Sequence, residues 1–355
     1  MKLMSLSRQK GVALITVLLV MVIAIAAITH AVTRNRLAIS RTSAILANTQ
    51  LAEFVHGAEA WAIITLEKDF IEDQAASESS DNLMELWAQK QVEFNPDNGK
   101  IRILIKDLQS CFNVNNLTAP RSGGGSSSGA GRGGSSSGSS SGASGSSGGS
   151  SGGSSGGTGA HQVLQRMVRN LGGQPDVALA IEDWLDAGDT PLASGSEDNG
   201  YLGLELAYRT PDTLITDPSE LRAVQGMEAE TWSLLRPELC ALPEAGTSVN
   251  VNTASAELLN AMYPSANIAG LISQRESGVV FSQMADLTAF DITGSGELDF
   301  STSYYVAHIA VQLGLEHRQY WESVLKLDNT TGKIQVIQRQ RREFSGQFLQ
   351  ELLGV

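Results

Sequence analysis

The first 41 residues contain no Asp or Glu, and a short basic start runs directly into an uncharged stretch from Val12 to Thr33. At about 1.5 Å per residue, a helix over this stretch would be roughly 30 Å long, which is the thickness of a bilayer's hydrocarbon core. The polar residues Thr16, Thr29 and His30 fall within it, and the two hydroxyls can bond to carbonyls inside the helix. The stretch therefore predicts one membrane-spanning helix.

This helix is expected to continue beyond the membrane. From Leu37 to Phe70 there is no Pro and only one Gly, and apolar residues recur at near-helical spacing. Unbroken from Val12 to Phe70, the helix would be about 90 Å long, half in lipid and half amphipathic. A cleaved secretory signal is the alternative, but its apolar core is usually only about 7–15 residues long. Three basic residues lie on each side of the span, so counting them leaves its orientation open.

The composition allows a substantial core and two lobes beyond the helix. The chain has 355 residues, 42% of them hydrophobic, and a formal net charge of -13. Such an acidic chain repels nucleic acid and suits an aqueous compartment. Residues 122–159 are almost purely Gly and Ser, and they predict a disordered loop because they bury too little apolar surface to offset their ordering entropy. The irregular repeats favour a natural insertion over an engineered linker.

Strand patterns lie on both sides of this loop. Upstream, residues 91–105 read as a hairpin, with a turn at residues 95–99 followed by alternating Ile101, Ile103 and Ile105. Downstream, residues 163–290 have a helical texture, whereas residues 304–315, 320–327 and 333–342 are rich in β-formers. The order of helix, strands, helices and strands predicts an α+β fold in which an antiparallel sheet is interrupted by a large all-helical inserted domain.

The sequence GVALITVLLV after the basic leader resembles the signal of type IV pilins and type II secretion pseudopilins. The resemblance implies cleavage after Gly11 by a prepilin peptidase, which would make Val12 the first mature residue with an N-methylated amine. Most such proteins carry Glu at the fifth mature position, but here it is Thr16. In the family's assembly model that Glu neutralises the N-terminus of a neighbouring subunit inside the membrane. Its absence in a long chain is the pattern of the minor pseudopilin K family, whose members lie at the pseudopilus tip.

Further stretches carry the same resemblance: CFNVNNL at residues 111–117 and IEDWLDAGDTPLASGSEDNGY at residues 181–201. The implied fold is a pilin-like α/β head interrupted by a helical insert. The implied domains are a leader (1–11), the transmembrane part of the helix (12–33), the periplasmic helix with the first part of the pilin-like domain (34–117), the helical insert (118–303) with the Gly/Ser loop (122–159) and hairpin segments (217–290), and C-terminal strands that complete the pilin-like domain (304–355).

Two segments within residues 217–290 suggest helix-hairpin-helix units, a motif that binds DNA phosphates through helix starts and basic side chains. In the second unit, Asn252 and Thr253 offer a cap for the helix AELLNAM, and Ile268 to Arg275 form its partner helix. Basic residues are sparse among many acids from residue 202 to residue 300, so binding to DNA would be weak. We therefore expect a structural or protein-binding role and no nucleic-acid partner.

An acidic cluster with several glycines occupies residues 183–200. Carboxylates on a flexible loop can supply the six to eight oxygens that Ca²⁺ needs, but the EF-hand spacing is absent, so a solvated acidic loop is equally open from these residues alone. The resemblance implies a calcium site, because K pseudopilins bind calcium in their helical domain. The expected ligands are Asp186, Asp189, Glu197 and Asp198.

Cys111 and Cys240 are the two cysteines of the chain. In an oxidising compartment an even pair favours a disulfide, and two buried free thiols are the alternative. A disulfide would tie the entry of the helical insert to its later part.

No catalytic motif accompanies these features, because the five His residues are scattered and the common hydrolase, nucleotide-binding and zinc patterns are absent. We expect an assembly component and not an enzyme. The resemblance implies a single-pass inner-membrane protein with its N-terminus cytoplasmic and its C-terminal domain periplasmic. Implied partners are minor pseudopilins of the I and J types, the major pseudopilin, the prepilin peptidase, the inner-membrane secretion platform, and the secretin or exported proteins. A tip-located minor pilin of a type IV pilus is the alternative.

Overall fold

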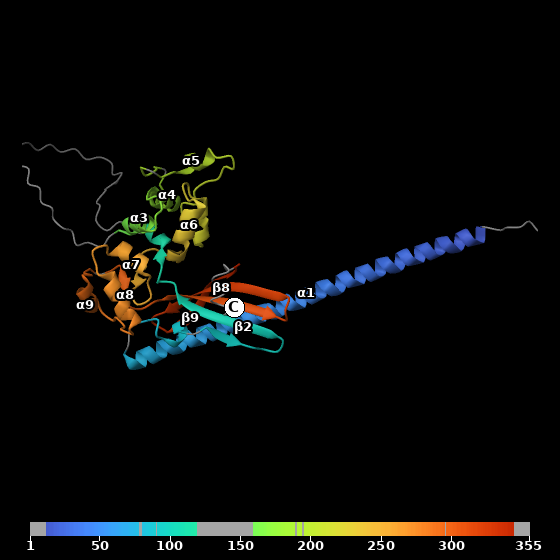
Figure 1. The fold of residues 1–355 in the computed structure, drawn as a ribbon, viewed down its shortest axis with the longest axis horizontal. Coiled ribbons are helices and arrows are strands. Elements are labelled where there is room, and N and C mark those ends of the chain that lie inside the picture. The colour runs from blue at the N-terminus through green and yellow to red at the C-terminus, as the bar shows by residue number, and fades with distance from the viewer. Residues whose placement is uncertain are drawn as a thin grey trace, which may run out of the picture.

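The computed structural model describes residues 12–77, 80–89, 91–118, 159–188, 190–193, 195–294 and 296–343. The predicted leader and all but the last residue of the predicted Gly/Ser loop lie outside these ranges. The first described element is a single long helix, α1 (Val12–Ala76), which projects far beyond the rest of the molecule (Figure 1). The continuous helix predicted from Val12 to Phe70 is confirmed and runs six residues further.

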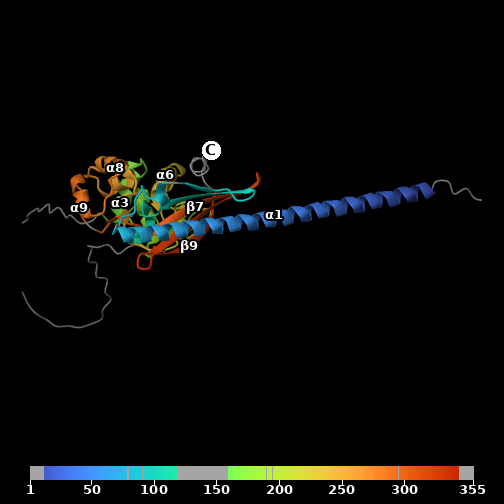
Figure 2. The ribbon, with the colours of Figure 1, turned by 90° about the horizontal axis from the view of Figure 1, so that it is seen from below.

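The first half of α1 is exposed and is here called the bare half, whereas the second half packs against the sheet. Every side chain described from Leu14 to Leu46 is exposed, and this half is long and apolar enough to cross a membrane. From Ala47 onward α1 lies along one face of a sheet, as Figure 2 shows from below. It buries side chains three or four residues apart, which is the spacing of one helix face: Leu51, Val55, Ala58, Ala62 and Leu66.

The sheet has five antiparallel strands in the order β1-β2-β7-β8-β9. Their bounds are β1 (Val92–Phe94), β2 (Gly99–Asp107), β7 (Tyr304–Leu313), β8 (His317–Asp328) and β9 (Lys333–Arg341). The predicted hairpin and the three predicted C-terminal strands are thereby confirmed. In β2 the alternating Ile101, Ile103 and Ile105 face α1 and pack with the apolar side chains of β7, β8 and β9 into the first core.

One charged side chain lies within this first core. Glu59 of α1 is 3% exposed, and both of its carboxylate oxygens accept hydrogen bonds from Arg339 of β9 at 2.5 Å. Ser323 of β8 donates a third bond. Burial raises the pKa of Glu59, but the bonds from Arg339 and Ser323 outweigh it and the pKa is lowered. Glu59 therefore fixes the rotation of α1 against two strands.

The remaining elements form a second body, here called the helical lobe, which occupies residues 108–303. It contains η1 (Val114–Thr118), α3 (Ala160–Asn170), α4 (Asp176–Leu185), α5 (Asp198–Leu202), η2 (Pro218–Ala223), α6 (Ala229–Leu235), η3 (Arg236–Glu238), α7 (Ala256–Met262), α8 (Ile268–Glu276), α9 (Met284–Leu287) and η4 (Thr288–Phe290). Its own core includes Phe112 and Val114, ahead of the boundary that the sequence places at residue 118. The short helix α2 (Leu86–Gln89) belongs to the first core through Trp87.

The helical lobe is not entirely helical. Strand β3 (Phe112–Asn113) pairs in parallel with β4 (Leu239–Cys240), and β5 (Val249–Asn250) pairs in parallel with β6 (Leu298–Asp299). Two-residue strands lack the length that produces an alternating pattern, so the sequence showed no sign of them. Both pairs join segments that are far apart in the chain, close to the point where the lobe leaves the sheet.

That point is one end of the sheet. The last residue of β2, Asp107, is paired with Tyr305 near the start of β7, so the chain leaves and re-enters the sheet at the same place. Figure 1 shows the helical lobe beyond this end, away from the bare half of α1. The helical lobe is consequently an insertion between β2 and β7 that does not interrupt their pairing.

The start of α7 differs from the prediction. Asn252 is fully buried, and its side chain bonds both the N–H and the carbonyl of Phe281, so it braces two segments instead of capping the helix. The cap is Ser255, whose Oγ accepts a bond from the N–H of Leu258 at 3.0 Å. The prediction of Asn252 or Thr253 as the cap is wrong because residues 251–253 form a turn and the helix begins only after Ser255.

Replacing Ser255 with Ala is expected to lower the free energy of unfolding by about 1 kcal/mol, the usual effect of losing an N-cap bond. Ser233→Ala is the matched control, because Ser233 lies inside the equally short α6 and bonds the carbonyl of Glu230. Urea unfolding of both variants measures the difference. Equal losses in the two variants would contradict a capping role for Ser255.

Candidate functional site

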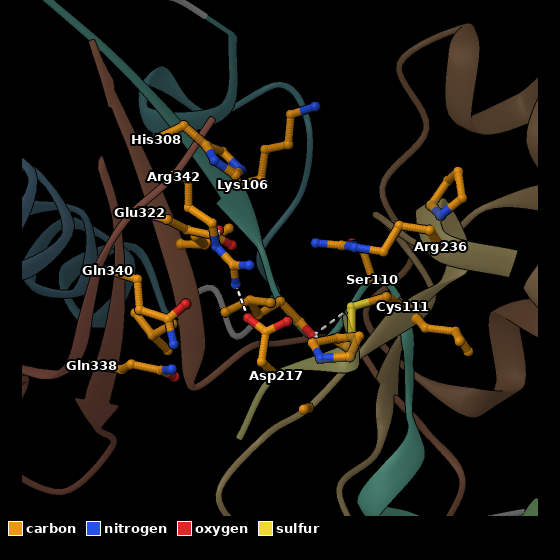
Figure 3. Close-up of a pocket in the computed structure, with 18 of the residues that line it drawn as sticks. Lys106, Ser110, Cys111, Asp217, Arg236, His308, Glu322, Gln338, Gln340 and Arg342 are labelled. Atoms are coloured by element: carbon orange, nitrogen blue, oxygen red, sulfur yellow. Dashed lines mark hydrogen bonds and ion pairs between the residues drawn. A yellow bond between two sulfur atoms is a disulfide. The ribbon is translucent and has the colours of Figure 1, made fainter. Parts of the chain in front are cut away.

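The helical lobe meets the sheet on the face opposite α1, and a cavity of about 170 Å³ lies between them (Figure 3). We call it the seam cavity. From the sheet side it is lined by Lys106, His308, Glu322 and, just after β9, Arg342, and from the lobe by Cys111, Asp217, Arg236 and Cys240. Lys106 alternates with Ile105, which faces α1, so these strand residues belong to the outer face of the sheet.

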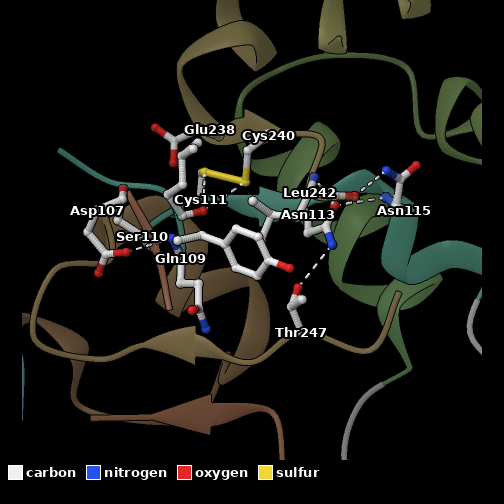
Figure 4. Close-up of a disulfide and its surroundings, with 12 residues drawn as sticks. Asp107, Gln109, Ser110, Cys111, Asn113, Asn115, Glu238, Cys240, Leu242 and Thr247 are labelled. Atoms are coloured by element: carbon white, nitrogen blue, oxygen red, sulfur yellow. Dashed lines mark hydrogen bonds between the residues drawn. A yellow bond between two sulfur atoms is a disulfide. The ribbon is translucent and has the colours of Figure 1, made fainter. Parts of the chain in front are cut away.

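The structure joins Cys111 and Cys240 in a disulfide beside this cavity, with the two Cα atoms 5.8 Å apart (Figure 4). Cys111 immediately precedes β3, and Cys240 ends β4. The bond and the parallel pairing of β3 with β4 therefore hold the same two segments together. The entry of the helical lobe is fastened to a segment 129 residues further along the chain.

Two asparagines also hold the entry of the helical lobe to its later segments, through hydrogen bonds of their side chains. Asn113 donates to the carbonyl of Glu244 and to Thr247, and its side-chain oxygen accepts from the N–H of Leu242. Asn115 is fully buried; it donates to the carbonyls of Ile215 and Leu242 and accepts from the N–H of Ile215. An Asn side chain carries both donors and an acceptor, so it can replace a strand partner on each side. This is the physical use of the N-x-N pattern in the sequence.

The expected calcium ligands lie around the loop that joins α4 to α5. Asp186 is partly exposed and accepts the N–H of Gly188 at 2.8 Å. Asp198 is already engaged, because Arg209 forms an ion pair with it at 2.9 Å and Thr210 donates two bonds to it. Asp189 lies outside the described residues. Of the expected ligands that the structure describes, Asp198 is thus the least suited to hold an ion, and Asp186 and Glu197 remain the better candidates.

Carboxylates around this loop are also buried, and two of them, Asp183 and Glu182, were not among the expected ligands. Asp183 is fully buried, and Glu182 and Glu197 are 4% and 6% exposed. Burial raises the pKa of Asp183, a bond from the N–H of Leu192 lowers it, and the neighbouring Asp186 and Glu182 raise it further. A Cβ added to Gly195 would lie 1.7 Å from Asp183, so only glycine allows the chain to wrap this carboxylate. Carboxylates are the hard oxygen donors that Ca²⁺ prefers, although no three of the described carboxylates of this loop bring their oxygens within 4.8 Å of one another.

A second group of carboxylates was not foreseen from the sequence. One oxygen from each of Asp69, Asp81 and Glu85 lies within 4.8 Å of the others, and we call these three residues the carboxylate cluster. Burial raises their pKa values, and neighbouring carboxylates, Asp73 in each case, raise them further, to about 7 for Asp69, about 7 for Asp81 and about 9 for Glu85. At neutral pH the cluster therefore holds protons that ordinary carboxylates would have lost.

The carboxylate cluster joins α1 to both lobes. Tyr305 of β7 donates to Asp81 at 3.0 Å, the N–H of Thr302 donates to Asp81, and the N–H of Asp81 bonds the carbonyl of Phe300. Trp87 donates to Glu85. The signal available in the sequence was the sudden density of acids after residue 66, at the end of a helix that carries few before it. That signal is easily taken for a solvated helix end.

The hairpin formed by α7 and α8 uses its basic residue internally. Arg275 donates to the carbonyls of Val251 and Ala254 at 3.1 and 2.7 Å, and burial lowers its pKa. Its guanidinium holds the loop before α7 in place. A DNA-binding hairpin needs such a group directed at phosphates. This arrangement agrees with the expectation of a structural hairpin.

Comparison with known proteins gives a consistent result. Two family models match, both described as type II secretion system (T2SS), protein K: one over residues 110–244 and one over residues 249–302. Relatives named type II secretion system protein K include those of Dickeya chrysanthemi, 37% identical over 72% of this chain and 73% of the relative, and Pseudomonas aeruginosa, 30% identical over 93% and 92%. The relative from Klebsiella pneumoniae is 30% identical over 72% of this chain and 71% of its own length.

A solved structure shares the fold. It is the GspK-GspI-GspJ complex from the enterotoxigenic Escherichia coli type 2 secretion system. The match covers 86% of this chain and 100% of the solved chain, with a TM-score of 0.63 and 20% sequence identity. The part of the chain that the match covers therefore has a fold already observed in a solved protein.

Proposed function

Since the chain belongs to the protein K family of the type II secretion system, and is therefore a minor pseudopilin, we propose that it occupies the tip of the pseudopilus. There it would help to start assembly and support the export of folded proteins across the outer membrane. It acts through its surfaces and anchor, and we propose no catalysis by this chain.

The observation that carries this proposal is the position of the helical lobe. The lobe lies beyond the end of the sheet where β2 meets β7, on the side away from the bare half of α1. A subunit stacked above would have to occupy the space of the lobe, whereas the bare apolar half of α1 remains available to helices below. Thr16 fits the same position, because a tip subunit has no N-terminus above it to neutralise.

The bare half of α1 supports a single-pass anchor in the inner membrane. We propose that the N-terminus is cytoplasmic, that the sheet and helical lobe are periplasmic, and that the prepilin peptidase cuts after Gly11 and methylates Val12. The partners would be the I-type and J-type minor pseudopilins and the major pseudopilin, in line with the solved GspK-GspI-GspJ complex. The secretion platform, and the secretin or exported proteins, would be further contacts.

Processing at Gly11 is tested by intact mass and N-terminal sequencing of the protein from its native membrane. A mature chain that begins with methylated Val12 is the expected result, and Gly11→Leu should leave the leader attached. A start near Ala27 or Val32 would mean a secreted soluble protein and would overturn the anchor.

The tip position is tested by labelling. An epitope placed in the Gly/Ser loop should mark one end of each pseudopilus that assembles when the system is overexpressed. Deletion of the gene should abolish secretion while the surface pili persist. Label along the whole filament, or loss of pili with secretion intact, would contradict the proposal.

We propose that the loop between α4 and α5 binds calcium through Asp186 and Glu197, with Asp183 and the sequence-predicted Asp189 as further ligands. Micromolar to millimolar Ca²⁺ should raise the melting temperature of the detergent-solubilised chain, because the ion binds only the folded loop. Asp186→Asn together with Glu197→Gln should abolish this rise. Asp212→Asn, an exposed position outside the loop, is the matched control. A rise that survives the double substitution would place the ion elsewhere.

A further inference from the structure

The seam cavity has a charge pattern that the assembly role does not explain. Its wall contains three cations, Lys106, Arg236 and Arg342. Two facing carboxylates are already used by Arg342, which forms ion pairs with Asp217 and with Glu322, the latter at 2.7 Å. The third lining carboxylate, Asp107, accepts bonds from Asn250, Thr253 and Thr302. The negative charges of the wall are therefore engaged by these neighbours.

Arg236, unlike Arg342, has no carboxylate partner among the described residues. It begins η3 on the lobe side of the cavity, and Figure 3 shows its side chain reaching towards the strands. Within the part of the chain that the structure describes, no side chain forms a hydrogen bond or ion pair with its guanidinium. A guanidinium presents five donors in a planar fork that matches a carboxylate or phosphate. Arg236 thus offers these donors to the cavity.

The lowered pKa of His308 reflects its burial and the positive charges around the seam cavity. It lies on β7 at the wall of the seam cavity, and its pKa falls to about 3 because of burial and the positive charges of Lys106, Arg236 and Arg342. All three cations therefore act on one point. In a chain of net charge -13, the cavity thus gathers three cations where the two lobes meet.

We propose that the seam cavity is a binding site for a small oxyanion, a carboxylate or a phosphate, held between Arg236 of the helical lobe and Arg342 of the sheet. A volume of about 170 Å³ accommodates an anion of that size with its remaining water. Two guanidiniums on opposite walls can bond the same anion from both sides. The anion would bridge the two lobes next to the Cys111–Cys240 disulfide and hold their mutual orientation.

Thermal unfolding of the full chain in detergent micelles tests this proposal, with sodium phosphate and sodium acetate compared with sodium chloride at equal ionic strength. Phosphate or acetate should raise the melting temperature by about 2–4 °C with a saturable dependence on concentration. Arg236→Gln should abolish the rise, and Arg236→Lys should restore part of it because the positive charge returns. Arg222→Gln, an exposed arginine of the same lobe, should keep the full rise.

A second readout separates a bound anion from a general salt effect. With histidine labelled for NMR, the His308 ring signals should shift on addition of phosphate, with the same half-saturation as the thermal effect. The signals of His56, exposed on α1, should stay unchanged. Failure of both oxyanions to stabilise the chain beyond chloride, or an equal loss in the Arg222→Gln variant, would overturn the site.

Discussion

Replacing Cys111 and Cys240 together with Ser is expected to lower the free energy of unfolding by about 2–5 kcal/mol. The disulfide closes a loop of 129 residues, and a long closed loop restricts the unfolded chain strongly. The loss should fall on the helical lobe, because the pairing of β3 with β4 is too short to hold its entry alone. Urea unfolding of the micelle-bound protein under oxidising conditions measures it.

The double replacement also has an internal control. Adding a reductant to the native protein should reproduce the destabilisation, and reductant should leave the double variant unchanged. Membrane insertion should be the same in both forms, because α1 lies outside the closed loop. Equal unfolding midpoints for the two oxidised proteins would show that the disulfide contributes nothing to stability.

The carboxylate cluster should make the protein less stable at alkaline pH. The folded pKa values of Asp69, Asp81 and Glu85 lie above the ordinary values of 3.8 and 4.5, so the folded state binds more protons than the unfolded state. This contribution is complete below about pH 4, and it is lost as the pH rises through about 7 for the two aspartates and about 9 for Glu85. Since one pKa unit corresponds to about 1.4 kcal/mol and coupled groups do not add, we expect a fall of about 2–4 kcal/mol between pH 5 and pH 9.

Asp69→Asn should flatten this profile. It removes one member of the cluster while keeping its size, so the variant should resemble the native protein at pH 5 and exceed its stability at pH 9. Asp97→Asn, an exposed position in the turn between β1 and β2, is the matched control and should follow the native curve. A profile that is flat in the native protein, but falls when a chelator is added, would mean that a cation and not protons fills the cluster.

The parts of the fold that the sequence predicted are those with a local period. The spacing of Leu51, Val55, Ala58 and Ala62 predicts the helix face that packs on the sheet, and the alternation of Ile101, Ile103 and Ile105 predicts the strand beneath it. The strand pairs β3–β4 and β5–β6 have no period, because each is two residues long and joins distant segments. The role of Asn252 was missed for the same reason, since its partner is Phe281.

The candidate sites divide in the same way. The acidic loop around Asp186 is contiguous in the chain, so its cluster of carboxylates is visible in the sequence, while its use as a calcium site was implied by the resemblance alone. The carboxylate cluster combines residues from α1 with residues from the loop before α2, and only the packing of α1 against that loop makes them neighbours. The seam cavity needs three distant segments to bring Arg236, Arg342 and His308 around one space. Composition and spacing do not indicate which residues, far apart in the chain, lie close together in the fold.

The return of the chain to the same end of the sheet also means that the sheet is complete only when a long loop has closed. Strand β2 is synthesised early, but its neighbour β7 follows only after the entire helical lobe. Contacts between such distant segments form slowly, because the chain between them must first be closed into a loop. A lobe that folds by itself shortens this search, since its β3–β4 pairing and its disulfide hold the entry segment near residues that come much later. The sheet would then close last, because the folded helical lobe brings the ends of β2 and β7 together before they pair.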